Sequence, residues 1–101
     1  MNFNQLTDAE TERLSILLEE LGEAQQAVGK ILRHGYESFD PTIMSGPAPS
    51  NRSNLEKELG DVSFIVELMC KRHDIDKPTI RARRLAKAIK IEEYLHHQGK
   101  L

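Results

Sequence analysis

Leucine, isoleucine and valine recur every three or four positions along the first third of the chain, and this spacing sharply limits the possible folds. The residues in the pattern are Leu14, Leu17, Leu18, Leu21, Val28, Ile31 and Leu32. Such a period places apolar side chains on one face of an α-helix. The capping-box pattern Thr7-Asp8-Ala9-Glu10 precedes it, and Gly35 follows as a stop signal. The sequence therefore predicts a helix over residues 7–33.

Two later segments also have helical spacing. A second capping-box pattern, Ser53-Asn54-Leu55-Glu56, predicts a helix that ends near residue 72. Its main stripe is Leu55, Leu59, Val62, Val66 and Met69, and further apolar residues outside the stripe predict a central helix buried on most sides. Pro78 is expected in the first turn of a third helix that ends at residue 94 or 97. No segment shows strand-like alternation, so the predicted fold is all-α, with three main helices in an antiparallel bundle.

The segment between the first two helices, residues 34–52, has no periodicity and is rich in proline and glycine. A connection of this length without secondary structure is unusual in a compact domain. Such loops are either functional lids or locally disordered segments, and one loop can be both. The sequence leaves these alternatives open.

Composition excludes several classes of protein. With 101 residues, the chain is long enough for one domain, residues 1–101, whose modest core favours oligomerisation. A single cysteine, Cys70, can form neither an internal disulfide nor a thiolate zinc site alone. No apolar run approaches the roughly 18 residues of a membrane span, and residues 1–8 lack the features of a signal peptide. We therefore expect a cytoplasmic protein that does not associate with membranes.

Charge is unevenly distributed along the chain. The net charge of -2 combines eight acids and three bases in residues 1–50 with eight acids and eleven bases in residues 51–101. The basic excess is concentrated in the third predicted helix, at Arg81, Arg83, Arg84, Lys87 and Lys90. This distribution suits a site that binds cations and anions together, although ordinary solvated helix faces would also produce it.

Four acids occupy positions that are unusual for a solvated surface. Glu20 and Glu23 on the first helix, and Glu58 and Asp61 on the second, are each three residues apart and so share a helix face. Each pair is continuous with an apolar row, which contains Ile16 and Ala27 on the first helix and Ile65 and Leu68 on the second. We therefore expect the carboxylates at the edge of the core, facing another helix.

Converging carboxylates need a compensating charge, because burying one unpaired ion costs several kcal/mol. No basic residue lies in either acid row at the neighbouring turns, whereas a divalent cation is a natural partner for hard oxygen ligands. Gly22 and Gly60 each precede an acid inside a helix, which predicts close helix approach or ligand access. Mg²⁺ usually keeps positions open for water and phosphates, which indicates phosphoryl chemistry. The candidate phosphate contacts are Lys30, Arg33, Arg81 and Arg84.

The two acidic motifs together resemble a known family. Glu19-Glu20-Leu21-Gly22-Glu23 matches an E-E-x-x-E pattern, and Glu58-Leu59-Gly60-Asp61 matches E-x-x-D. In this order on two helices, over about residues 10–72, they resemble the MazG-like all-α nucleoside triphosphate pyrophosphohydrolases. The resemblance implies Mg²⁺-dependent hydrolysis (Mn²⁺ is also possible) between the α- and β-phosphates, releasing a nucleoside monophosphate and pyrophosphate. It further implies that Glu20, Glu23, Glu58 and Asp61 bind the metal, and that Glu19 orients or deprotonates the attacking water.

The resemblance also implies a homodimer or homotetramer, with a four-helix-bundle-like active-site core near the subunit interface. One departure is the spacing, since the 34 residues between Glu23 and Glu58 are more than is usual for the family. The extra loop would close over the base or carry specificity, and Tyr36 or Phe39 would either stack on a nucleobase or pack against the helices.

A second hypothesis belongs to a different class of protein. The chain would be a non-catalytic helical interaction module that contacts a partner through its basic third helix, with Arg81, Arg83 and Arg84 dominating the binding. Specific nucleic-acid binding is not expected, because the net charge is negative and no helix-turn-helix pattern is present.

Overall fold

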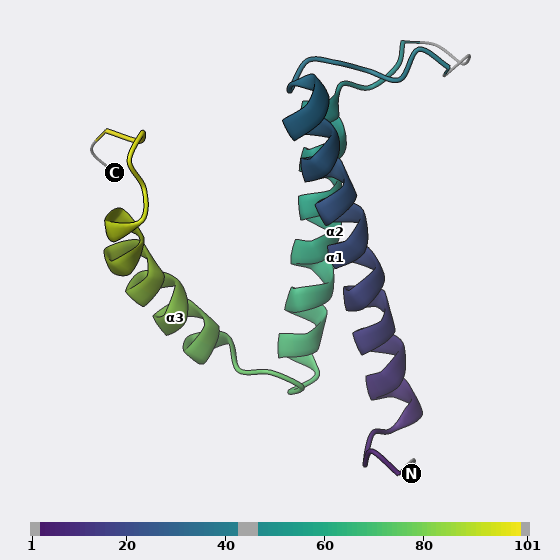
Figure 1. Cartoon of the computed structure of the whole chain (residues 1–101). Helices are drawn as coiled ribbons and strands as arrows, with labels where there is room; N and C mark the ends of the chain where they lie inside the picture. The colour runs from purple at the N-terminus through teal and green to yellow at the C-terminus, as the bar shows by residue number, and fades with distance from the viewer. Residues whose placement is uncertain (1–2, 43–46, 100–101) are drawn as a thin grey trace.

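The computed structural model describes residues 3–42 and 47–99, so residues 43–46 of the predicted loop lie outside the described part. The elements are α1 (Asp8–His34), α2 (Asn51–Lys71), α3 (Lys77–Lys90) and the short 3₁₀-helix η1 (Ile91–Glu93). The described residues contain no strand, only an isolated antiparallel bridge between Phe39 and Ser50. The prediction of an all-α chain with three main helices is confirmed (Figure 1).

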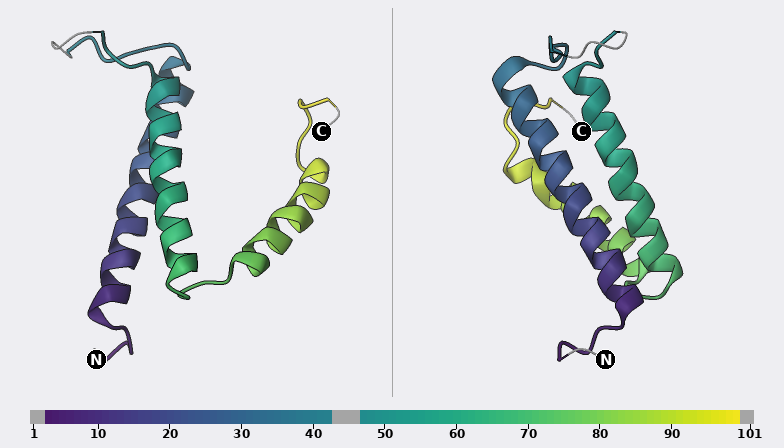
Figure 2. Two further views of the ribbon diagram at one scale, coloured as in Figure 1. Left: turned by 180° about the vertical axis from the view of Figure 1, so that it is seen from behind. Right: turned by 90° about the vertical axis from the view of Figure 1, so that its right-hand side faces the viewer.

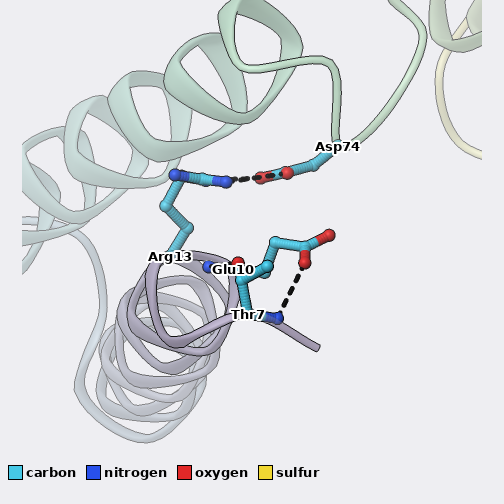
Figure 3. A network of polar contacts seen from close by, with 4 residues as sticks. All are labelled: Thr7, Glu10, Arg13 and Asp74. Carbon is cyan, nitrogen blue, oxygen red and sulfur yellow. Dashed lines mark hydrogen bonds and ion pairs between the residues drawn. The ribbon is translucent and has the colours of Figure 1, made fainter. Parts of the chain in front are cut away.

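Helix α1 begins and ends where its local sequence predicts. The backbone N–H of Glu10 donates to Thr7 Oγ1 (3.1 Å), and the Thr7 N–H donates to Glu10 Oε1 (2.9 Å), which forms the predicted capping box (Figure 3). At the other end Gly35 adopts φ of 90° and donates its N–H to the carbonyl of Ile31 (2.7 Å). A positive φ favours glycine, which explains why the helix stops there.

Helix α2 begins one turn earlier than predicted, and the cap is Ser50 rather than Ser53. Ser50 Oγ accepts the N–H of Ser53 (3.1 Å). The N–H groups of Asn51 and Arg52 donate to two loop carbonyls, at 2.8 Å each. Three of the four N–H groups that a helix start leaves unpaired are thus satisfied by the preceding chain. Because two of the acceptors come from distant residues, the local pattern indicated the wrong start.

Helices α1 and α2 run side by side in opposite directions, forming an antiparallel hairpin (Figures 1 and 2). The buried apolar residues in the described part of the chain are Ala27 on α1 and Ile65 and Met69 on α2. Ile65, with an exposed fraction of 0%, belongs to the acid row that was expected to face another helix, whereas Leu59 from the main stripe is 52% exposed. The prediction that α2 is buried on most sides is wrong for the single chain, because α1 is the helix that packs along it within residues 3–42 and 47–99.

An ion pair ties the start of α1 to the turn after α2. Arg13 Nε and Nη2 donate to Asp74 Oδ2 and Oδ1 at 2.6 and 2.9 Å (Figure 3). Both side chains are largely buried, and two parallel bonds give the pair a defined geometry. Hydrogen bonding from Arg13 holds the pKa of Asp74 below its ordinary value. The pair therefore ties the two helices together at the open end of the hairpin, opposite the long loop.

Helix α3 lies apart from the hairpin (Figures 1 and 2). It starts after Asp76, whose Oδ2 accepts the N–H of Thr79 (3.1 Å), and it ends at Lys90, earlier than predicted. None of its residues is buried. Packing of all three helices into one bundle stays a prediction. Many large apolar side chains on all three helices are exposed in the single chain, among them Leu14, Leu18, Leu21, Leu32, Phe64, Leu85 and Ile89.

Candidate metal centre

Four carboxylates from the two hairpin helices meet between them. Glu20 and Glu23 come from α1, and Glu58 and Asp61 come from α2. One carboxylate oxygen from each residue can be chosen so that all four lie within 4.8 Å of one another. The structure thus brings together the four acids that the sequence singled out as metal ligands.

The position of the cluster follows from the rows in which the acids lie. On α1, Ala27 continues the row of Glu20 and Glu23 by one turn and is buried. On α2, Ile65 follows Asp61 by one turn and is the most buried residue. Because the apolar members of each row form the contact between the helices, the acidic members must face each other across the same contact. The expectation that these acids face another helix is confirmed.

The carboxylates are only partly satisfied by the protein. Glu20 Oε2 and Glu58 Oε2 are buried and have no hydrogen-bond partner within residues 3–42 and 47–99. Burial raises the pKa of Glu20, and the charges of Asp61 and Glu58 raise it further. A hydrogen bond with Glu58, together with its charge, raises the pKa of Glu23. Such buried oxygens are costly in their charged form unless a cation compensates them, and without a cation the raised pKa values favour the protonated form.

One lysine beside the cluster was missed by the sequence analysis. Lys57 Nζ lies 3.4 Å from Glu58 Oε1, and the charge of Glu58 raises the pKa of Lys57. Lys57 directly precedes Glu58, and adjacent residues do not share a helix face. Lys57 is therefore outside the rows of residues that contain the four acids. Its side chain is mostly exposed, and one solvated ammonium does not neutralise four converging carboxylates.

The other predicted site residues are placed differently. Glu19 is exposed and outside the group of four, although its charge contributes to the raised pKa values of Glu20 and Glu23. Lys30 lines a cavity of about 370 Å³ that also has Glu23 and Glu58 in its wall. Arg33, another candidate for phosphate contacts, lines a neighbouring cavity. Arg81 and Arg84 lie on α3, which is apart from the helices that carry the cluster.

The glycines that precede the acids do not mark a close approach of the helices within this chain. A Cβ atom at Gly22 or Gly60 would meet no atom within 4 Å. Of the two reasons predicted for these glycines, close helix approach is therefore not found within the described residues of this chain, and ligand access stays a prediction.

The donor set fits a hard divalent cation. All four candidate ligands are carboxylates, and two of them carry buried oxygens that lack a protein partner. Mg²⁺, Mn²⁺ and Ca²⁺ prefer such oxygens, whereas soft metals prefer sulfur or imidazole ligands. The arrangement can therefore hold a divalent cation at the surface between two helices, next to a cavity lined by lysines.

Comparisons with known protein families, with curated proteins and with solved structures found no match. Among the described residues, no helix combines the length and the apolar character that crossing a membrane requires.

Proposed function

We propose that this protein is a Mg²⁺-dependent nucleoside triphosphate pyrophosphohydrolase that cleaves between the α- and β-phosphates. The products are a nucleoside monophosphate and pyrophosphate. The observation that carries the proposal is the convergence of four carboxylates from two helices, two of them with buried oxygens that lack a protein partner. The MazG-like motif pair, E-E-x-x-E followed by E-x-x-D, supports the same conclusion.

Each acid has a role in this proposal. Glu20, Glu23, Glu58 and Asp61 would hold the cation through their partly buried carboxylates. A bound Mg²⁺ supplies the positive charge that neutralises phosphate oxygens and makes water a better nucleophile at neutral pH. Glu19, exposed beside the cluster, orients the attacking water and accepts its proton.

The basic residues bind the polyphosphate. Lys30 shares a cavity wall with Glu23 and Glu58, which supports a role for its ammonium in binding phosphate oxygens next to the cation. Arg33 lies further along the same helix and lines the adjoining cavity. Arg81 and Arg84 lie on α3, away from the cluster of their own chain, so we propose that they act at the site of a second subunit.

Assembly into a homodimer or homotetramer belongs to the same proposal. Leu14, Leu18 and Leu21 leave much of their surface exposed on α1, as does Phe64 on α2. Large apolar patches of this kind mark protein contacts. If the α1–α2 hairpins of two subunits packed through these exposed side chains, they would form the four-helix-bundle-like core that the resemblance implies. Assembly would then cover apolar side chains that are exposed in the single chain.

Pyrophosphate release from a panel of nucleoside triphosphates, with and without Mg²⁺, tests the proposed activity. We expect Glu20→Gln and Asp61→Asn to abolish turnover while far-ultraviolet circular dichroism shows an unchanged helical content. Glu12→Gln, an exposed acid on α1, is the matched control and should retain full activity. Failure of metal-replete protein to release pyrophosphate from any nucleotide would refute the proposal, and retained activity in both variants would remove these acids from the mechanism.

A second candidate function, a non-catalytic interaction module, is favoured by α3. This helix carries six basic residues and no acid, is exposed along its length, and has a shallow cavity between Ile80, Arg84 and Ile91. The module predicts partner binding through Arg81, Arg83 and Arg84 and no effect of metal. Titration calorimetry with Mg²⁺ or Mn²⁺ separates the two candidates. Only the hydrolase predicts a saturable heat of metal binding, and Asp61→Asn should eliminate that heat.

A further inference from the structure

A groove leads from the acidic cluster to the start of the long loop. One cavity, of about 370 Å³, has Glu23 and Glu58 in its wall. A second cavity, of about 470 Å³, has Phe39 and Asp40 in its wall. We call residues 35–41 the loop ribbon; of these, residues 38–41 line the cavity. Three side chains line both cavities and so join them: Lys30, Asn51 and Asn54. The two cavities therefore form one continuous binding surface.

The two ends of this groove differ in chemistry. The end at the cluster has the ammonium groups of Lys30 and Lys57 beside carboxylates, which suits a cation–phosphate complex. The end at the loop ribbon has the ring of Phe39 together with the basic side chains of Arg33 and His34 and the polar side chains of Asp40 and Asn54. An aromatic side chain in a positively charged groove is a composition that binds nucleotides, because bases stack on the ring while the basic groups follow the phosphates. The volume of the second cavity is also within the range of about 300–1,000 Å³ for small-molecule sites.

The loop ribbon is held in place rather than loosely attached. Asn51 N–H donates to the carbonyl of Ser38, and Arg52 N–H donates to the carbonyl of Tyr36, both at 2.8 Å. These bonds lie just before Phe39 in the chain, and Phe39 itself is bridged to the cap of α2. Phe39 nevertheless keeps 58% of its surface exposed. The chain therefore fixes an apolar ring at the cavity wall without covering it, which reduces the entropy cost of binding a ligand there.

Of the two aromatic residues in the loop ribbon, only Phe39 lines the cavity. The guanidinium of Arg52 lies 4.3 Å from the ring centroid of Tyr36, and its Nε donates to Glu37 Oε1 at 2.7 Å. Tyr36 is thus already stacked with a cation. Phe39 is the side chain available to a ligand.

Asp40 adds a preference among bases. Its Oδ1 accepts the Oγ1–H and N–H of Thr42, at 2.7 and 2.9 Å, and these bonds hold the pKa of Asp40 below its ordinary value. Asp40 therefore stays ionised and can only accept hydrogen bonds. The other carboxylate oxygen, Asp40 Oδ2, takes no part in the bonds to Thr42. It can accept a hydrogen bond from an amino group of a ligand, whereas a ligand carbonyl oxygen at the same place has no hydrogen to donate.

On the basis of the proposed function, we infer that the cavity at the loop ribbon binds the nucleobase of the substrate. Phe39 stacks on the base, and Asp40 selects bases that carry an exocyclic amino group. The substrate class is then nucleoside triphosphates of adenine, guanine or cytosine, in preference to those of uracil, thymine or hypoxanthine. The basic residues Lys30, Arg33 and Lys57 bind the phosphates, with Lys57 at the cluster end of the groove and Arg33 where it lines the cavity at the loop ribbon.

Steady-state kinetics of Phe39→Ala test the stacking role. Loss of one base–aromatic stack should raise the KM for the best substrate by about 10- to 100-fold with little change in kcat. Inhibition by pyrophosphate, which occupies only the phosphate end, should be unchanged. Phe3→Ala makes the same truncation at an exposed residue before the start of α1, and it should behave as wild type. An active Phe39→Ala enzyme with unchanged KM would overturn the inference.

Two matched pairs of nucleotides test the amino-group preference: dCTP with dUTP, and dATP with dITP. Each pair differs by an amino group against a carbonyl oxygen at one ring position. The wild type should have the higher kcat/KM for the amino member of each pair, and Asp40→Asn should reduce that ratio. Equal kcat/KM values within both pairs, or ratios that Asp40→Asn leaves intact, would overturn the assignment to Asp40.

A binding measurement separates failure of this inference from failure of the proposed hydrolase. AMP and CMP, added without metal, should shift the NMR signals of the Phe39 ring and the Asn54 side-chain amide in the wild type, and not in Phe39→Ala. If these shifts occur while no nucleotide is hydrolysed, the cavity assignment stands and the hydrolase proposal fails. If hydrolysis occurs without these shifts at saturating nucleotide, the base binds elsewhere and the inference fails.

Discussion

Truncation of Ile65 to alanine tests the packing of α1 against α2, on which the acidic cluster depends. The side chain has an exposed fraction of 0%, so all three carbons that the change removes are buried. At about 0.8 kcal/mol per buried carbon plus a cavity term, the expected loss is about 3 kcal/mol. That is a large part of the roughly 5–15 kcal/mol expected for a domain, and it should lower Tm by roughly 12–24 °C.

Thermal and urea unfolding, followed by far-ultraviolet circular dichroism, measure this loss. Leu18→Ala is the matched control, because it also removes three carbons but from a side chain that is 75% exposed. In dilute protein it should cost less than about 1 kcal/mol. A cost of Leu18→Ala that grows with protein concentration would identify the outer face of α1 as a subunit contact. An Ile65→Ala cost below about 1 kcal/mol would refute the packing described here.

Three further predictions concern the cluster and the start of α2. Mg²⁺ or Mn²⁺ at about 100 times its Kd should stabilise the protein by about 2.7 kcal/mol, a Tm rise of roughly 10–20 °C, and an equal rise in Asp61→Asn would exclude the cluster as the binding site. Because the pKa values of Glu20 and Glu23 are raised on folding, the folded state binds protons more tightly at these groups. The free energy of unfolding of the metal-free protein should therefore increase as the pH falls from the raised pKa values toward the ordinary value of 4.5. The same stabilisation should be lost as the pH rises through the raised pKa values. Urea titrations at a series of pH values measure this dependence. Glu23→Gln should flatten this profile, and a profile of the opposite slope would contradict the assigned shifts. Ser50→Ala should cost about 1 kcal/mol in the same unfolding assay, whereas Ser53→Ala should cost much less, and the reverse order would support the cap predicted from the sequence.

The accuracy of the sequence predictions depends on how local the deciding interactions are. The start of α1 was predicted correctly because its capping box involves only Thr7 and Glu10, three residues apart. The start of α2 was predicted wrongly because the N–H groups of Asn51 and Arg52 bond to carbonyls in the loop ribbon, about fifteen residues away. A pattern that spans four residues contains no information about such acceptors.

The acidic site shows the same division. Spacing at i, i+3 identified Glu20, Glu23, Glu58 and Asp61 correctly as a converging set. It did not identify Lys57, whose contact with Glu58 depends on side-chain reach rather than on a shared face. The groove residues Asn51 and Asn54 were missed as well, because they line a cavity only once the loop ribbon has folded against both helices.

By itself, then, the sequence determined the helical class, the extent of α1 and the two acidic faces, since these follow from hydrogen bonds and side-chain periods within a few residues. Only the tertiary structure decided that Ile65 is at the centre of the helix contact while Leu59 remains exposed. It also decided that α3, with Arg81 and Arg84, lies away from the acidic cluster of its own chain. The pairing of α1 with α2 depends on contacts between residues about forty positions apart in the sequence, such as Glu20 and Asp61. The spacing of apolar residues within one helix does not show which of its apolar faces the other helix will cover.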